Sequence, residues 1–221
     1  MNSVGDSFGW AFRDPQWLQK MLVQGLIVLI PIVGWIAMTG WLMMAFENAR
    51  EGKNELPPAG FHLDRGIAIF VMFLVYSIVL DIPAFILYGL GGGTSSAGSS
   101  NNAAAAAASG FFSLGGLWGF VARLILAFLT PSLIVNTYHR GFAGGFDIER
   151  VWHMATVNVS NSVVAGLIVF VASLIGGFGF VICCVGIIFT IPFENAITAA
   201  AVAWFEKVQS APATPPTAPA T

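Results

Sequence analysis

Apolar residues fill long stretches of this chain, and polar residues are confined mainly to the segments between them. A helix that spans a bilayer needs about 20 mostly apolar residues. Segments of about that length lie at residues 21–46, 66–90, 116–138, 163–185 and 187–205. The pattern therefore predicts an all-α integral membrane protein with about five transmembrane helices, and six is the alternative count.

Prolines interrupt four of these segments, at positions 31, 83, 131 and 192. Proline removes a backbone donor and bends a helix, so we expect several proline-kinked helices. The first segment is ambiguous, because a helix over residues 15–47 would be about 50 Å long and would exceed the membrane thickness. It forms either one kinked span or a re-entrant pair broken at Pro31, and we favour the kinked span.

The last two segments predict a C-terminal helical hairpin. Together they run for about 43 residues, twice the length that one span needs. Glycines near the middle of this run are the natural place for the turn, and we expect the second helix to start near Phe178. These glycines are Gly176, Gly177 and Gly179.

Two segments are low in complexity and carry no charge. Residues 91–110, GGGTSSAGSSNNAAAAAASG, are expected to form a flexible loop between the second and third spans. Residues 208–221 are expected to form a disordered Pro/Ala/Thr tail. The rest of residues 1–207 then forms a single helical membrane domain.

Lysine and arginine in short loops indicate orientation, because cytoplasmic loops carry an excess of both. With five spans, Arg13 and Lys20 lie on one side, and six others lie on the opposite side: Arg50, Lys53, Arg65, Arg140, Arg150 and Lys207. We therefore expect a multi-pass protein of the cell inner membrane with a cytoplasmic C-terminus. A re-entrant first segment would instead place all eight on one side.

Composition excludes a soluble domain. Hydrophobic residues make up 57% of the chain and charged residues only 9%, whereas a soluble domain carries about 25% charged residues. No basic cluster indicates a nucleic-acid partner. The adjacent Cys183 and Cys184 lie in an apolar run and are expected to fill space in a helix, since neighbouring cysteines rarely form a disulfide. The N-terminus lacks the basic start and short apolar core of a cleaved signal.

Two polar segments resemble those of a known family. ENAREGKNELPPAGFHLDRGIAIFVMFLVY contains Leu56 and Pro57, and RGFAGGFDIERVWHMATVNVSNSVVAGLIVF contains a Gly-Phe-Asp loop that ends at Asp147. With the Ile-Pro helices beside them, these segments resemble the prokaryotic polytopic membrane proteins classed as domain of unknown function 4013. The resemblance covers most of residues 8–207. It implies an architecture and no activity.

Three charged residues lie inside apolar runs: Asp81, Arg123 and Glu194. Each costs about 2.5–3.5 kcal/mol at the bilayer centre, so each should face protein or water and have a partner. Counting along the five-span helices puts Asp81 about 21 Å from the inner face and Arg123 about 9 Å from the outer face. In a core about 30 Å thick these levels coincide, which predicts an Asp81–Arg123 ion pair.

The last helix carries a polar stripe. Thr190, Glu194 and Thr198 are spaced four residues apart and share one helix face, with Asn195 beside them. In one interpretation, which we favour, Glu194 is a neutral or hydrogen-bonded carboxylate that fastens the helix to its neighbours. In the other, Glu194 and Asp81 line a polar path for a proton, a cation or an amphipathic substrate. The adjoining face is rich in alanine and permits close helix contact.

No catalytic motif or metal-ligand spacing occurs in the sequence, so we expect neither an enzyme nor a cofactor or metal site. Asp147 is expected to cap an amphipathic helix. The predicted function is that of a structural or assembly partner in the bilayer, which contacts other membrane proteins or a second copy. The alternative is a small transporter or permeation subunit with Glu194 in a polar path.

Overall fold

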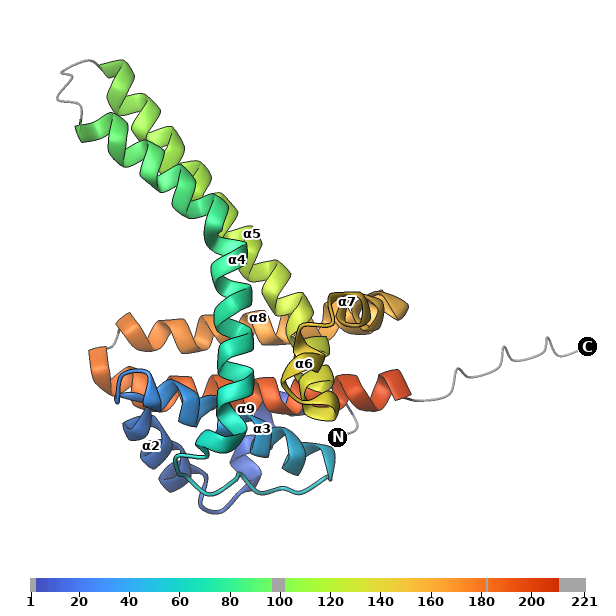
Figure 1. Cartoon of the computed structure of the whole chain (residues 1–221). Coiled ribbons are helices and arrows are strands. Elements are labelled where there is room, and N and C mark those ends of the chain that lie inside the picture. The colour runs from blue at the N-terminus through green and yellow to red at the C-terminus, as the bar shows by residue number, and fades with distance from the viewer. Residues whose placement is uncertain (1–2, 97–101, 182, 211–221) are drawn as a thin grey trace, which may run out of the picture.

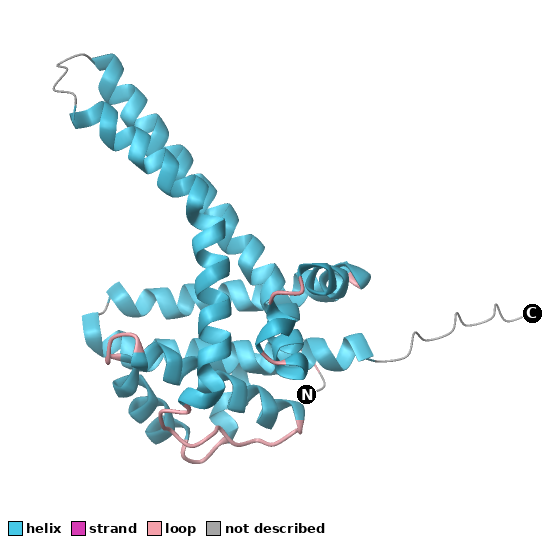
Figure 2. Cartoon of the chain, viewed as in Figure 1, coloured by secondary structure: helices cyan, strands magenta, loops and turns pink. Residues whose placement is uncertain are grey.

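Every regular element in the described part of the chain is a helix. The computed structural model describes residues 3–96, 102–181 and 183–210. Short loops join the helices (Figure 2). In chain order the elements are α1 (Asp6–Trp10), η1 (Ala11–Arg13), α2 (Trp17–Val28), α3 (Val33–Arg50), α4 (Leu63–Ser96), α5 (Asn102–Arg140), α6 (Phe142–Gly145), α7 (Ile148–Val157), α8 (Val159–Val181) and α9 (Cys183–Ser210).

Four helical segments in the described residues are long and apolar enough to cross a membrane: Leu63–Leu90, Ser113–Arg140, Val159–Val181 and Gly186–Ser210. Together with the shorter α2 and α3, they confirm the predicted fold class, an all-α integral membrane protein with about five membrane helices. Pro83, Pro131 and Pro192 each lie inside a continuous helix. The C-terminal hairpin is also confirmed, since α8 and α9 lie side by side (Figure 1).

The turn of this hairpin lies later than predicted. Helix α8 continues to Val181 and α9 begins at Cys183, so the three glycines that we expected at the turn lie inside α8. Two of them bring α8 close to α9 instead. A Cβ at Gly176 would clash with Glu194 Oε2, and a Cβ at Gly179 would clash with Thr190 Oγ1. Here glycine permits close packing and does not reverse the chain.

Residues 21–46 do not form the single kinked span that we favoured. The helix is interrupted between Val28 and Val33, and α2 and α3 fold back on each other, as in the re-entrant alternative. Lys20, near the start of α2, donates from Nζ to Leu56 O at 2.7 Å. Leu56 lies in the loop that follows α3, so the start of α2 and the end of α3 lie beside the same loop. Pro31 lacks a backbone N–H, and Ile32 next to it adopts a positive φ of 64°. These two residues account for the break.

Helices α4 and α5 extend beyond the other helices as a two-helix arm (Figure 1). Most of the segment predicted as a flexible loop belongs to this arm: residues 91–96 end α4, and residues 102–110 begin α5. The loop prediction was wrong there, and in the second part the reason is that alanine, which fills residues 103–108, has the highest helix propensity. Residues 97–101 lie outside the described residues. Helix α9 reaches Ser210, and the rest of the predicted tail also lies outside them.

The body of the molecule packs around α9, whose alanine-rich face is buried. Ala196, Ala199 and Ala200 are inaccessible to solvent, which agrees with the close helix contact predicted for this face. Pro192 cannot donate to Ile188 O, and α2 approaches that carbonyl so closely that a Cβ on Gly25 would clash with it. Small residues therefore allow both α2 and the other helices to approach the axis of α9.

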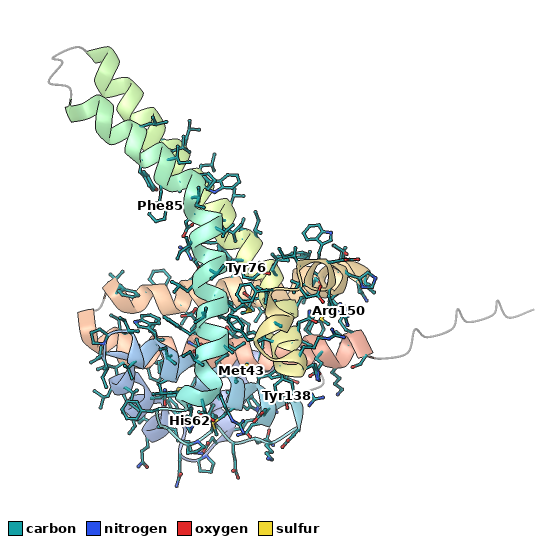
Figure 3. All side chains as sticks on the ribbon, viewed as in Figure 1. Met43, His62, Tyr76, Phe85, Tyr138 and Arg150 are labelled. Carbon is teal, nitrogen blue, oxygen red and sulfur yellow. The ribbon has the colours of Figure 1, made fainter. Side chains whose placement is uncertain are left out.

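Ion pairs gather the helix ends at one end of the body, which we call the charged end. Glu206 of α9 binds Arg50 of α3 at 2.8 Å and His139 of α5 at 2.6 Å, and Glu47 of α3 binds Arg65 of α4. Figure 3 shows Tyr138, next to His139, low in the body and Phe85 far away on the arm. Arg140 and Lys207 adjoin His139 and Glu206 in the sequence, and Arg13 and Lys20 bond to the loop that follows α3.

Candidate functional site: a polar cavity among the helices

The polar stripe of α9 faces α8 and a cavity beside it. Thr190 Oγ1 donates a hydrogen bond to Gly176 O in α8 at 3.2 Å. Asn195 Nδ2 donates to Ile191 O, one turn earlier in α9, at 2.8 Å. Thr190 thus contributes to helix packing, while Asn195 and the two remaining stripe residues line the cavity.

Glu194 lies against the backbone of α8 at Gly176, where only a glycine leaves room for its carboxylate. Across the described part of the chain, no side chain or backbone group donates a hydrogen bond to this carboxylate, and no cation pairs with it. Of the favoured interpretation of Glu194, a neutral or hydrogen-bonded carboxylate, the hydrogen-bonded form therefore finds no donor in these residues, whereas the neutral form needs none.

The cavity has a volume of about 410 Å³ and lies among α3, α4, α5, α8 and α9. Apolar side chains supply most of its wall. Its polar residues are Thr39, Ser77, Arg123, Thr130, Ser173, Glu194, Asn195 and Thr198. Several hydroxyl groups bond within their own helices: Thr130 Oγ1 donates to Leu126 O at 2.7 Å, and Ser173 Oγ donates to Phe170 O at 2.7 Å.

Glu194 lies deep along α9, far from the charged end. It precedes Glu206, which marks the charged end, by three turns of α9. At 1.5 Å per residue this places the Glu194 backbone about 18 Å from that end. A hydrocarbon core is about 30 Å thick, so an α9 that crosses the membrane from the charged end would hold Glu194 near the middle of that core.

The predicted Asp81–Arg123 ion pair is present. Arg123 Nη2 lies 2.8 Å from Asp81 Oδ2 and joins α5 to α4. A second bond connects the same helices, because Trp118 Nε1 donates to Leu80 O at 2.7 Å. Arg123 also lines the cavity, whereas Asp81 adjoins it only through Arg123. One end of the cavity therefore carries a cation whose charge is already compensated.

Four of the six predicted site residues line the cavity: Arg123, Glu194, Asn195 and Thr198. Our list of site residues missed Thr39, Ser77, Thr130 and Ser173, which also line it. Each is a hydroxyl residue among mostly apolar neighbours in its helix, and Ser77 stands one turn before Asp81. Because such residues also bond to their own backbone, their sequence positions alone do not distinguish cavity lining from ordinary packing.

Other predicted features lie elsewhere. Asp147 caps α7, since its Oδ1 accepts a hydrogen bond from Arg150 N at 3.2 Å, as predicted. A search of the described residues finds no group of three or more His, Cys, Asp or Glu side chains arranged to hold a metal. The side chains of Cys183 and Cys184 lie outside those that the structure describes.

Four apolar spans and a polar cavity among them define a polytopic helical membrane protein. Over residues 23–190 the chain matches the family described as protein of unknown function (DUF4013). This match covers most of the chain, which therefore belongs to that family, and it confirms the resemblance seen in the two polar segments. No curated protein and no solved structure matches the chain.

Proposed function

We propose that this protein is a small transporter or permeation subunit, without enzymatic activity, whose binding centre is the cavity that contains Glu194. One observation carries the proposal: a carboxylate near the middle of the membrane lines a cavity of about 410 Å³ and has no donor or counter-ion in the described residues. An ionised carboxylate in an apolar medium is costly unless a positive charge reaches it. A proton or a cation from outside the chain would supply that charge.

The depth of Glu194 supports the same function. Acids inside membrane helices commonly mark ion paths, proton relays or substrate sites. Transporter sites also lie near the bilayer midplane, often beside interrupted helices. The break between α2 and α3 ends close to the cavity, because Trp35 in the first turn of α3 lines it.

We also propose that the protein lies in the inner membrane of a prokaryotic cell with its charged end in the cytoplasm. Arg50 and Arg65 form ion pairs at that end, Arg13 and Lys20 bond to the loop beside it, and Arg140 and Lys207 adjoin its paired residues in the sequence. The positive-inside rule favours this orientation. Both α1 and the C-terminal end of α9 lie there, so both termini would be cytoplasmic.

Assembly with other membrane proteins or with a second copy is the second candidate function. The α4–α5 arm supports it, because the arm projects from the body and Phe85 on it is 66% exposed. The alanine-rich face of α9 offers no such surface, since it is buried within the chain. A partner would therefore contact the arm.

Flux through proteoliposomes tests the proposed function. We expect the wild-type chain to carry protons or a monovalent cation under an imposed membrane potential, measured with a pH-sensitive or ion-sensitive dye inside the vesicles. Glu194→Gln removes the charge while keeping the size, and should lower the flux by about tenfold or more. Glu149→Gln is the matched control, because Glu149 is exposed on α7 and remote from the cavity lining.

The opposite result would favour assembly. If wild type, Glu194→Gln and Glu194→Leu all give the flux of empty vesicles, while only the leucine variant unfolds at a lower temperature in detergent, then Glu194 serves packing and the transport proposal is wrong.

A further inference from the structure

We infer that the cavity binds a lipophilic organic monocation, such as an amine or a quaternary ammonium with apolar substituents, which enters from the half of the membrane remote from the charged end. This inference rests on the proposed function and gives its substrate class. Charge, lining and shape of the cavity each support it.

The charge of the cavity selects a single positive charge. Two of its lining residues in the described chain are ionisable as acid or base, Glu194 and Arg123. Arg123 is paired with Asp81 at 2.8 Å and contributes no net charge together with it. The carboxylate of Glu194 is left without a counter-ion. A divalent metal ion such as calcium takes about six to eight oxygen ligands, and here one carboxylate faces the cavity among the described residues.

The lining selects an organic rather than an inorganic cation. Trp35, Phe70 and Phe73 line the cavity, and aromatic faces attract cations that have lost their hydration shell. Met38 and Leu42 add aliphatic side chains to the wall, and burial of apolar substituents against an apolar wall is favourable. The volume of about 410 Å³ falls in the range of small-molecule pockets, about 300–1,000 Å³.

Buried residues form the part of the lining nearest the charged end. Leu42 and Thr198 are buried lining residues. Each precedes the ionic residue at the end of its helix, Arg50 or Glu206, by about two turns, which corresponds to about 12 Å along the helix. No described lining residue of α3 or α9 lies nearer to that end.

The mouth lies on the opposite side. Trp35 and Ser173 are exposed lining residues, and by helix rise both lie about 20 Å from the charged end. Arg123 is exposed there as well, with 56% of its side chain accessible. An amphipathic cation partitions with its apolar part in the hydrocarbon, and the mouth, about 20 Å from the charged end, opens at a level within it.

Binding of two probes of matched size and opposite charge tests the inference. The purified full-length chain in detergent is titrated with radiolabelled tetraphenylphosphonium and, separately, with tetraphenylborate. We expect saturable binding of the cation and none of the anion. Glu194→Gln should weaken cation binding by about tenfold or more, as expected for loss of a charged partner, and Glu149→Gln should not. Trp35→Ala, at an exposed position, should weaken it several-fold.

The outcomes separate the substrate class from the proposed function. Preferred binding of tetraphenylborate, or equal binding of both probes that Glu194→Gln leaves unchanged, overturns the substrate class. If the wild type carries a Glu194-dependent proton flux but does not bind tetraphenylphosphonium, the substrate class is wrong and the transport function holds. If the cation binds through Glu194 but no flux of any tested ion or of the probe depends on Glu194, the site is correct and transport is wrong. If Glu194→Gln does not fold, the titration of Trp35→Ala tests the site instead. Weaker binding of the cation supports the site, and unchanged binding overturns it.

Discussion

Asp14 is a buried acid at the charged end that joins three segments of the chain. Its Oδ2 accepts hydrogen bonds from Lys20 Nζ and Leu56 N, both at 2.7 Å, and its Oδ1 accepts one from Gln16 N at 2.7 Å. Burial alone would raise the pKa of this carboxyl, but the bonds from Lys20, Gln16 and Leu56 outweigh burial and hold the pKa below its ordinary value. The carboxylate therefore stabilises the fold in its charged form.

Replacing Asp14 tests this role. Its pKa is about 3.9 in the unfolded chain and lower in the folded one, so its contribution is present above about pH 4 and is lost as the pH falls through the folded-state pKa. Asp14→Asn should lower the free energy of unfolding at pH 7 by about 2–4 kcal/mol and should reduce the loss of stability on acidification. Thermal unfolding in detergent between pH 2 and 7 measures both.

Glu55→Gln is the control for Asp14. Glu55 is exposed and lies next to Leu56, in the loop that Asp14 binds. Its unfolding temperature should remain close to that of the wild type. Equal unfolding temperatures for Asp14→Asn and the wild type at pH 7 would show that the three hydrogen bonds of Asp14 do not hold the loop.

At the scale of helices, the sequence predicts a contact between two helices correctly where regular helix geometry alone fixes that contact. Asp81 and Arg123 are paired as their depths predict, because a fixed rise per residue converts sequence position into level. Elsewhere, contacts between segments far apart in the sequence determine where a helix ends and what it packs against. Gly176 permits close packing where the sequence predicts a turn, and α2 is held beside the end of α3 by a loop that binds Lys20 from 36 residues away.

The cavity was predictable only in part for the same reason. Glu194 and Thr198 were identified because an acid in an apolar run is costly and the spacing of the stripe defines a helix face. Thr39, Thr130 and Ser173 come from three other helices. Which of their faces meet is set by the fold of the whole body, and no local sequence pattern carries that information.

The pair of Asp81 and Arg123 provides a test of the contact between α4 and α5. Asp81→Arg or Arg123→Asp alone leaves like charges together in the membrane and should lower stability by about 2.5 kcal/mol or more. The double exchange should restore most of the loss, measured as the amount of extracted protein and its unfolding temperature. The exposed pair of Glu51 and Lys53, with side chains 56% and 57% accessible, is the control, and its reversal should cost less than about 1 kcal/mol. Failure of the double exchange to recover stability contradicts the pairing.

Across the whole molecule, the folding back of α2 and α3 determines on which side the N-terminus lies. Trp10 Nε1 donates to Lys53 O at 3.0 Å, so the segment before α2 and the loop after α3 are neighbours. The four long apolar segments form two side-by-side pairs, α4 with α5 and α8 with α9 (Figure 1). If each of these four segments crosses the membrane once, both described ends of the chain lie on one side of it.

Cysteine labelling tests this topology in a background with Cys183→Ala and Cys184→Ala. Ser3→Cys and Glu55→Cys lie at the charged end, on opposite sides of the α2–α3 pair in sequence, and both positions are exposed. With the proposed orientation, a membrane-impermeant maleimide added to intact cells should label neither until the cells are opened. Ser113→Cys should be labelled in intact cells, because Ser113 precedes Arg140 by 27 residues, about 40 Å of helix, which exceeds the thickness of the hydrocarbon core. A single kinked span over residues 21–46 would put Ser3 and Glu55 on opposite sides of the membrane. Labelling of one position but not the other would therefore contradict the folded-back pair. Labelling of both positions, with Ser113 protected, would agree with the folded-back pair but reverse the orientation.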